Sequence, residues 1–185
     1  LIARVGAEGE LQVVGLGQAP SAGMQKGLVV EIGEAREAAR ASLEEAQRYL
    51  GRGPSWAYVG ITGGHISSLN RVGVLQGLGE EVTLSQHEIE HVIRSSYPEV
   101  EPGKEVLHVI PRGYVVDGLR GIRNPVGLHA DRVEVEAHVV MAEVPPLKNV
   151  VKAIEGAGVT PRALVLQALA AGEAVLSHDE KEMGV

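Results

Sequence analysis

The 185-residue sequence contains no cysteine and no phenylalanine, and only one tryptophan and four tyrosines. Without cysteine the chain forms no disulfide and offers no thiol nucleophile, which is compatible with a reducing compartment. Because aromatic side chains are so few, the core is expected to be aliphatic. No apolar run reaches the roughly 20 residues that a membrane-spanning helix needs.

Basic residues are also in the minority, with 17 Lys and Arg against 24 Asp and Glu and a formal charge of −7. Such a surface repels phosphate, so nucleic acid is not expected as a partner. A hydrophobic content of 44 % is ordinary for a globular chain and excludes a mainly disordered one.

Hydrophobic periodicity predicts alternating strands and helices. A hairpin of residues 1–5 and 11–16 precedes a turn-rich loop at 17–27, and alanines at helical spacing, continuing to Tyr49 and Leu50, predict a helix over 34–50. The other expected elements are strands at 56–62, within 65–75, and at 106–116, 133–141 and 159–165, and helices at 85–96, 147–154 and 166–176. Residues 118–130 are expected to be a loop, and 179–185 a polar ending. The order predicts an α/β layer architecture with an inserted strand-helix-strand-strand unit.

Residues 87–91 read His-Glu-Ile-Glu-His, the H-E-x-x-H pattern of zinc hydrolases. On a helix, however, Ile89, Val92, Ile93 and Ser96 form one face, and the two histidines lie about 160° and 200° from Ile89. Both imidazoles are therefore expected to face solvent. Ser85 and Glu88 also form an S-x-x-E capping box, which gives the glutamate a structural task. We therefore favour a solvated helix face over a catalytic zinc site.

Other motifs are weaker. Gly63-Gly64 could cradle an anion, but no lysine and no predicted helix follow, so a corner between two strands is favoured. His108 and His138 lie within apolar strands, which is more typical of sheet residues than of metal ligands. The sequence contains no G-x-S-x-G elbow.

Several runs nevertheless resemble one family, in its order and spacing. They are Val14–Gly17, Pro20–Gly27, Tyr58–Ser68, Val106–Pro111, Gly121–Leu128, Lys148–Ile154 and Asp179–Val185. Together these runs are similar to the FtsA family of bacterial cell-division proteins, which belongs to the actin-like ATPase superfamily. The resemblance extends over essentially the whole chain.

The resemblance implies an actin-like (ribonuclease-H-like) fold. Residues 1–62 and 143–185 would be parts of subdomain 1A, and 63–142 the inserted subdomain 1C of strand-helix-strand-strand type. Because the sequence starts at Leu1 without an initiator Met and stops near a further phosphate loop of the family, we expect it to be part of a longer protein.

The resemblance also implies a function. Proteins of this family bind ATP and Mg²⁺ between two lobes, link the FtsZ ring to the cytoplasmic membrane through a C-terminal helix, and recruit later division proteins, in part through 1C. Both phosphate loops, the FtsZ-binding region and the membrane helix would lie outside this sequence. We therefore expect no catalytic, cofactor or metal residues here and no ATP binding or hydrolysis by the chain alone. The intact protein would bind ATP, with weak or uncertain ATPase activity. That protein would lie in the cytoplasm, peripherally on the membrane at the division site.

Residues 63–142 would then be the protein-interaction part, through strand edges that accept a partner strand or through the polar helix face. The candidate residues on that face are Gln86, His87, Glu90, His91 and Arg94. Self-association into filaments is a competing use of the same surface. Two further interpretations stay open: a zinc-dependent hydrolase built on the H-E-x-x-H helix, and another actin-like protein such as a pilus-assembly relative.

Overall fold

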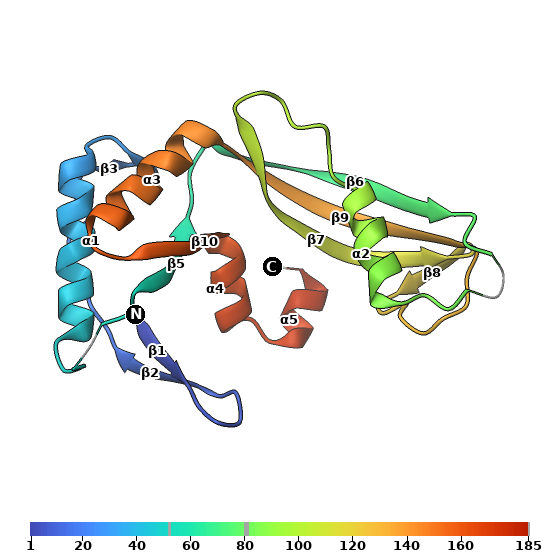
Figure 1. Cartoon of the computed structure of the whole chain (residues 1–185), viewed down its shortest axis with the longest axis horizontal. Helices are drawn as coiled ribbons and strands as arrows, with labels where there is room; N and C mark the ends of the chain where they lie inside the picture. The colour runs from blue at the N-terminus through green and yellow to red at the C-terminus, as the bar shows by residue number, and fades with distance from the viewer. Residues whose placement is uncertain (52, 80–81, 185) are drawn as a thin grey trace. The chain divides into compact units, whose positions relative to one another are not determined.

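The computed structural model of the chain describes residues 1–51, 53–79 and 82–184. These residues form two compact units, the first made of residues 1–65 and 144–185 and the second of residues 66–143. Each unit has its own strands and helices (Figure 1).

The first unit begins with the expected antiparallel hairpin of β1 (Ile2–Val5) and β2 (Leu11–Gly15). Two-residue strands β3 (Met24–Gln25) and β4 (Leu28–Val29) then pair across Lys26 and Gly27, both at positive φ. The turn-rich loop predicted at 17–27 therefore ends in a short hairpin that was not predicted. The missed signal is Lys-Gly, because glycine supplies the left-handed conformation of a tight hairpin turn.

Helix α1 (Ile32–Gln47) starts at Glu31, whose carboxylate accepts hydrogen bonds from the N–H groups of Gly33 and Glu34. Ala35 and Ala46 are buried, as the small-residue face predicted. Tyr49 was wrongly predicted to belong to this face, because the helix ends two residues earlier and the ring is 91 % exposed.

Two parallel strands, β5 (Trp56–Ile61) and β10 (Thr160–Leu166), form the other sheet of this unit. Helices α3 (Val144–Gly156) and α4 (Gln167–Val175) pack against β10, and α3 also contacts α1. The prolines of α3 lie in its first turn, where the missing N–H removes no helical hydrogen bond. The polar ending is not irregular: Ser177 and Glu180 form a capping box that starts α5 (His178–Met183). The predicted ending also includes Val185, which lies outside the described residues.

The second unit is an antiparallel sheet with one helix. Its strands are β6 (Ile66–Gln76), β7 (Lys104–Val116), β8 (Leu119–Ile122) and β9 (Arg132–Glu143), and their order in the sheet is β6-β9-β7-β8. Helix α2 (Gln86–Ser95) packs on β6 and β9.

Strand β8 lies within residues 118–130, which were predicted to be a loop, and pairs with the end of β7. Val116 and Leu119 face each other across Asp117 and Gly118, both at positive φ. An Asp-Gly pair between apolar residues is a strong hairpin signal in sequence, and it was overlooked. The Asp117 carboxylate also accepts a 2.8 Å hydrogen bond from the N–H of Arg132, which ties this turn to the start of β9.

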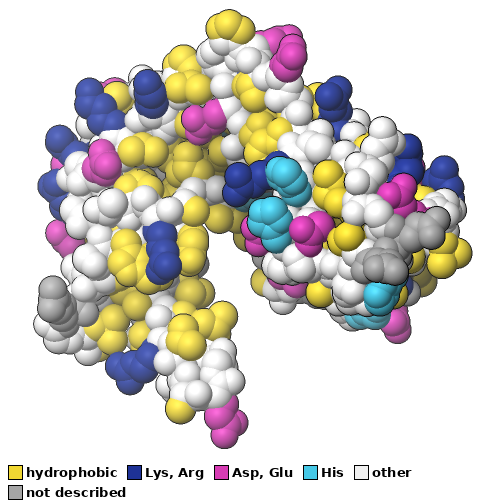
Figure 2. All heavy atoms as spheres, turned by 45° about the vertical axis from the view of Figure 1, so that its right-hand side comes forward, with side chains coloured by type: hydrophobic (Ala, Val, Ile, Leu, Met, Phe, Trp, Pro, Cys, Tyr) yellow, Lys and Arg dark blue, Asp and Glu magenta, His cyan; other side chains and the backbone are white. Residues whose placement is uncertain are grey.

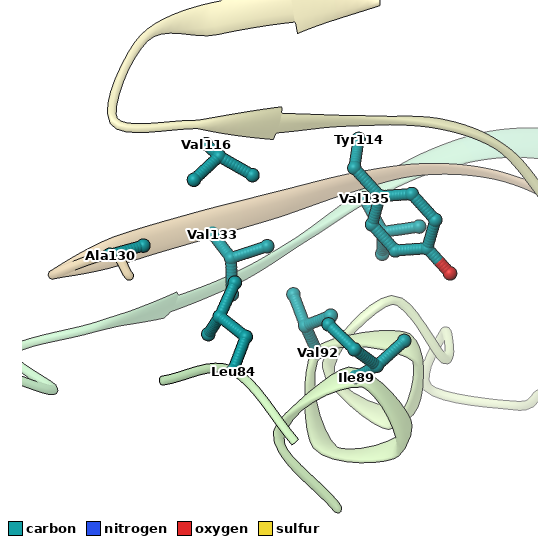
Figure 3. Close-up of a cluster of buried hydrophobic side chains, with 8 residues drawn as sticks. All are labelled: Leu84, Ile89, Val92, Tyr114, Val116, Ala130, Val133 and Val135. Carbon is teal, nitrogen blue, oxygen red and sulfur yellow. The ribbon is translucent and has the colours of Figure 1, made fainter. Parts of the chain in front are cut away.

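The core of the second unit lies between α2 and the sheet. Figure 3 shows Ile89 and Val92 pointing from the helix toward Val133 and Val135 of β9. Leu84, Tyr114, Val116 and Ala130 complete this buried cluster. Tyr114 is its one aromatic member, so the core is aliphatic for the most part, as the composition predicted.

Candidate functional site

Helix α2, the site of the H-E-x-x-H pattern, is fixed at its start by a capping box. The N–H of Ser85 donates a 2.9 Å hydrogen bond to Glu88 Oε2, and the Ser85 hydroxyl donates to the same oxygen. In return the N–H of His87 donates to Ser85 Oγ at 3.2 Å. The side-chain oxygens of Glu88 and Ser85 thus supply acceptors for backbone N–H groups that have no partner within the helix.

The capping box also determines the charge of Glu88. Hydrogen bonds from the Ser85 hydroxyl and N–H, and then from the His87 side chain, stabilise the carboxylate and lower the pKa of Glu88 to about 2. A general base that activates water needs a free carboxylate oxygen and a pKa near the working pH. Glu88 is therefore a structural anion.

The buried face of α2 is the one that the helical spacing predicted. Ile89 is 4 % exposed, and both Val92 and Ser96 are fully buried. The helix approaches β6 closely at Gly73, where a Cβ atom would lie 2.3 Å from the Val92 carbonyl oxygen and 2.8 Å from the Ser96 nitrogen. Glycine at this position lets the helix backbone contact the sheet.

The five predicted surface residues all lie on the exposed side of α2. They are Gln86, His87, Glu90, His91 and Arg94. Within this set the structure brings the two histidines together, with ring centroids 5.6 Å apart, and the side chain of His87 is 78 % exposed. Figure 2 shows that histidine, acidic and basic side chains are mixed on the surface of the second unit, in the right-hand part of the view.

A catalytic zinc site needs three protein ligands around an open coordination position. Within residues 1–51, 53–79 and 82–184, no group of three or more His, Asp or Glu side chains could hold a metal ion.

Three histidines outside α2 have different surroundings. His138 of β9 lies opposite Asn70 of β6, and its Nδ1 is 2.8 Å from the Asn70 side-chain oxygen, as expected for a sheet residue. His129 contacts the Thr83 hydroxyl at 3.2 Å. His65 is 6 % exposed, and neither ring nitrogen has a hydrogen-bond partner among the described residues.

The face of the sheet opposite α2 carries polar residues that the sequence reasoning did not single out. Arg132 donates to Gln76 at 2.8 Å and to Glu134 at 2.9 Å, and Arg120 lies 3.4 Å from Glu136. The sequence contains the alternation that indicates such a face, because polar residues alternate with buried ones along β9. The polar residues are Arg132, Glu134, Glu136 and His138. These pairs are exposed and contribute little to stability, so they define a polar surface and not a core.

Comparison with known proteins shows that both units are similar to parts of FtsA cell division proteins. Residues 63–141 match the family described as the SHS2 domain inserted in FTSA. All of the chain aligns with the cell division protein FtsA of Pseudomonas aeruginosa at 37 % identity and with that of Escherichia coli K12 at 34 %, covering 44 % of each relative. The Bacillus subtilis protein is 32 % identical over 95 % of the chain, which covers 40 % of that protein.

Solved structures show the fold independently of sequence. A chain of the PilM-PilN type IV pilus biogenesis complex superposes with a TM-score of 0.53, at 17 % identity, over 83 % of this chain and 40 % of that one. At this identity the likeness concerns the fold, and it supports the actin-like α/β fold predicted above. None of the described helices is both long enough and apolar enough to cross a membrane.

Proposed function

We propose that the chain belongs to the family of FtsA cell division proteins and acts in bacterial cell division as the protein-interaction part of an FtsA-type scaffold. The whole chain aligns with FtsA cell division proteins and spans about 44 % of their length. The observation that carries this proposal is alignment of the entire chain with FtsA proteins at 34–37 % identity. Residues 63–142 would recruit other division proteins.

The exposed side of α2 supports this assignment. Its capping box and its buried face hold the helix rigidly on the sheet, so Gln86, Glu90 and Arg94 are presented in a fixed geometry. Charges of both signs on a rigid surface contribute more to the specificity for a complementary partner than to the affinity for it. A second copy of the protein could use the same surface in filaments, which we retain as a competing use.

Strand β6 supplies a second element for recognition, because it forms one edge of the second unit's sheet. An edge strand presents backbone N–H and C=O groups to which an extended peptide can add. Recruitment through β6 would depend little on side-chain charge, so charge reversals on α2 distinguish the two routes.

The remaining functions are proposed for an FtsA-type protein as a whole. They comprise attachment of the FtsZ ring to the cytoplasmic membrane, location at the division site on its cytoplasmic face, and binding of ATP and Mg²⁺. For the chain itself we propose no nucleotide binding; the Gly63-Gly64 segment leads into strand β6 and not into a helix whose N-terminus could bind phosphate. Pilus biogenesis is a property of the complex that contains the structural neighbour, and the likeness to that neighbour concerns the fold alone.

Expression of residues 1–185 in Escherichia coli tests the interaction role. The chain should compete with the host's own FtsA for division partners and lengthen the cells as its level rises. Exchange of the charges on α2, Glu90→Lys with Arg94→Glu, should restore normal cell length, because it reverses the field that the partner meets. Cell length is measured by microscopy at matched amounts of soluble protein.

Helix α1 offers a matched control. Glu44→Lys with Arg48→Glu exchanges an exposed pair at the same i,i+4 spacing, with the arginine again at the end of its helix, and keeps the same net charge. This variant should lengthen cells as much as the unaltered chain. Equal loss of the effect from both exchanges, or no lengthening by the unaltered chain, would contradict the proposal.

A further inference from the structure

The two histidines of α2 belong to the candidate recruitment face, and their side chains allow a further function. His87 and His91 lie one helical turn apart on the exposed side, with ring centroids separated by 5.6 Å and ring planes inclined by 38°. Histidines at positions i and i+4 share one helix face, which is the arrangement that lets two imidazoles coordinate one metal ion.

We propose that His87 and His91 form a two-histidine site for a divalent transition-metal ion on the surface of α2. Imidazole nitrogen suits Cu²⁺, Ni²⁺ and Zn²⁺, and affinities for such ligands rise through the first-row series to a maximum at Cu²⁺. Mg²⁺ and Ca²⁺ prefer oxygen ligands and should not bind here. The proposal goes beyond the recruitment role and does not depend on it.

The environment of His87 orients one ligand. Its Nδ1 lies 3.3 Å from Glu88 Oε1, and an ionised carboxylate can only accept at this contact. The neutral imidazole therefore carries its proton on Nδ1, which leaves the lone pair of Nε2 for a metal ion. A carboxylate behind a ligating histidine is the usual support of a protein metal site. Glu88 is itself held by Ser85, so it acts as a positioning residue for His87.

The number of ligands sets the chemistry of the site. Two imidazoles leave two positions of a tetrahedral ion, or four of an octahedral one, to water or to a donor from another molecule. The glutamate that follows His87 in the motif, Glu88, is engaged in the capping box and does not serve to activate that water. The two histidines thus chelate a metal ion at the surface. The H-E-x-x-H motif then has a role in metal binding and not in hydrolysis.

Titration calorimetry of the full chain with Cu²⁺, Ni²⁺, Zn²⁺ and Mg²⁺ chlorides tests the proposal. We expect about one equivalent of each transition metal to bind, Cu²⁺ most tightly, and no heat from Mg²⁺. His87→Ala and His91→Ala should each weaken binding at least about tenfold, since either removes half of the chelate. His178→Ala removes a histidine from the first unit and should change nothing.

A second variant tests the geometry and not only the count of histidines. His91→Ala with Arg94→His keeps two histidines on the exposed side of α2 but separates them by seven residues, or about 10.5 Å along the axis. This distance prevents both from binding one ion, so the affinity should equal that of His91→Ala. Circular dichroism should show an unchanged fold, because all the altered residues are exposed.

Two results would overturn the proposal. The first is a chain that binds none of the three transition metals at micromolar concentrations. The second is retention of the parent affinity by His87→Ala or His91→Ala, or by the variant with the displaced histidine. Failure of recruitment in the cell-length experiment would leave calorimetric binding unaffected, so the two proposals fail separately.

Discussion

At the scale of single residues, the capping box of α2 distinguishes between two roles for Glu88 in the H-E-x-x-H pattern. Spacing alone allows Glu88 to be a catalytic base, because it follows the first histidine of H-E-x-x-H, or a capping residue, because it stands three residues after Ser85. The structure shows its carboxylate bonded to the Ser85 hydroxyl and N–H, with the core on the opposite side of the helix. Serine two residues before the first histidine was the signal that favoured capping.

The lowered pKa of Glu88 predicts an acid-sensitive contribution to stability. A carboxyl whose pKa falls from 4.5 in the unfolded chain to about 2 in the folded one stabilises the fold above pH 4.5, and this stabilisation is lost as the pH falls toward 2. Glu88→Gln should therefore unfold at a lower urea concentration near pH 7, with a difference from the parent that shrinks below pH 4.5. Urea unfolding at a series of pH values measures the difference near pH 7 and its decrease at lower pH.

Glu90→Gln is the control for this experiment, since it alters an exposed carboxylate of the same helix outside the capping box. The difference in urea midpoint between Glu90→Gln and the parent should not shrink below pH 4.5 as that of Glu88→Gln does. The pKa values of Glu31, Glu101 and Glu180 are also lowered, by backbone and side-chain hydrogen bonds, and act equally in all three proteins. A Glu88→Gln difference that stays constant with pH would contradict the structural role.

At the scale of elements, the position of α2 on the sheet depends on Gly73. No periodicity reveals this residue, because a glycine in a strand could equally mark a bulge or a weak point. Only the packed structure shows that the Val92 carbonyl oxygen lies 2.3 Å from the position that a Cβ atom would take. The hairpin of β7 and β8, in contrast, can be predicted from the local sequence, because Asp117-Gly118 is typical of a hairpin turn.

Replacement of Gly73 should loosen this contact. Gly73→Ala places a methyl group 2.3 Å from a backbone oxygen of α2, so the helix must shift, at a cost of about 1–3 kcal/mol of unfolding free energy. Urea unfolding of the full chain measures the loss.

Gly113 of β7 is the matched position, because a Cβ atom there would have no neighbour within 4 Å. Gly113→Ala should change the unfolding free energy by no more than about 0.5 kcal/mol. Similar losses from both substitutions would show that glycine flexibility, and not the approach of α2, determines the effect.

At the scale of the whole molecule, the chain consists of two units that each bury their own residues. The sheet, α2 and the aliphatic cluster of the second unit all lie within residues 66–143. The FtsA-type SHS2 family matches residues 63–141, so similarity in sequence and compactness in structure point to nearly the same segment.

A polypeptide of residues 63–143 should therefore fold alone. It is longer than the roughly 40 residues below which a core needs help from disulfides or metals, and its core cluster is complete. We expect a single cooperative urea transition and a dispersed amide NMR spectrum. Gly73→Ala should lower the midpoint in this polypeptide as in the full chain. A spectrum typical of an unfolded chain would show that the second unit needs the first.

The sequence by itself determined the features that depend on neighbours along the chain. Helical spacing located α2 and assigned its buried and exposed faces, because residues three and four apart meet on one helix face regardless of the rest of the molecule. The pairing of β6 with β9, the order β6-β9-β7-β8 and the contact at Gly73 were decided only by the tertiary structure. Strands distant in sequence pair where their apolar faces together cover a core, and that choice depends on all the strands at once.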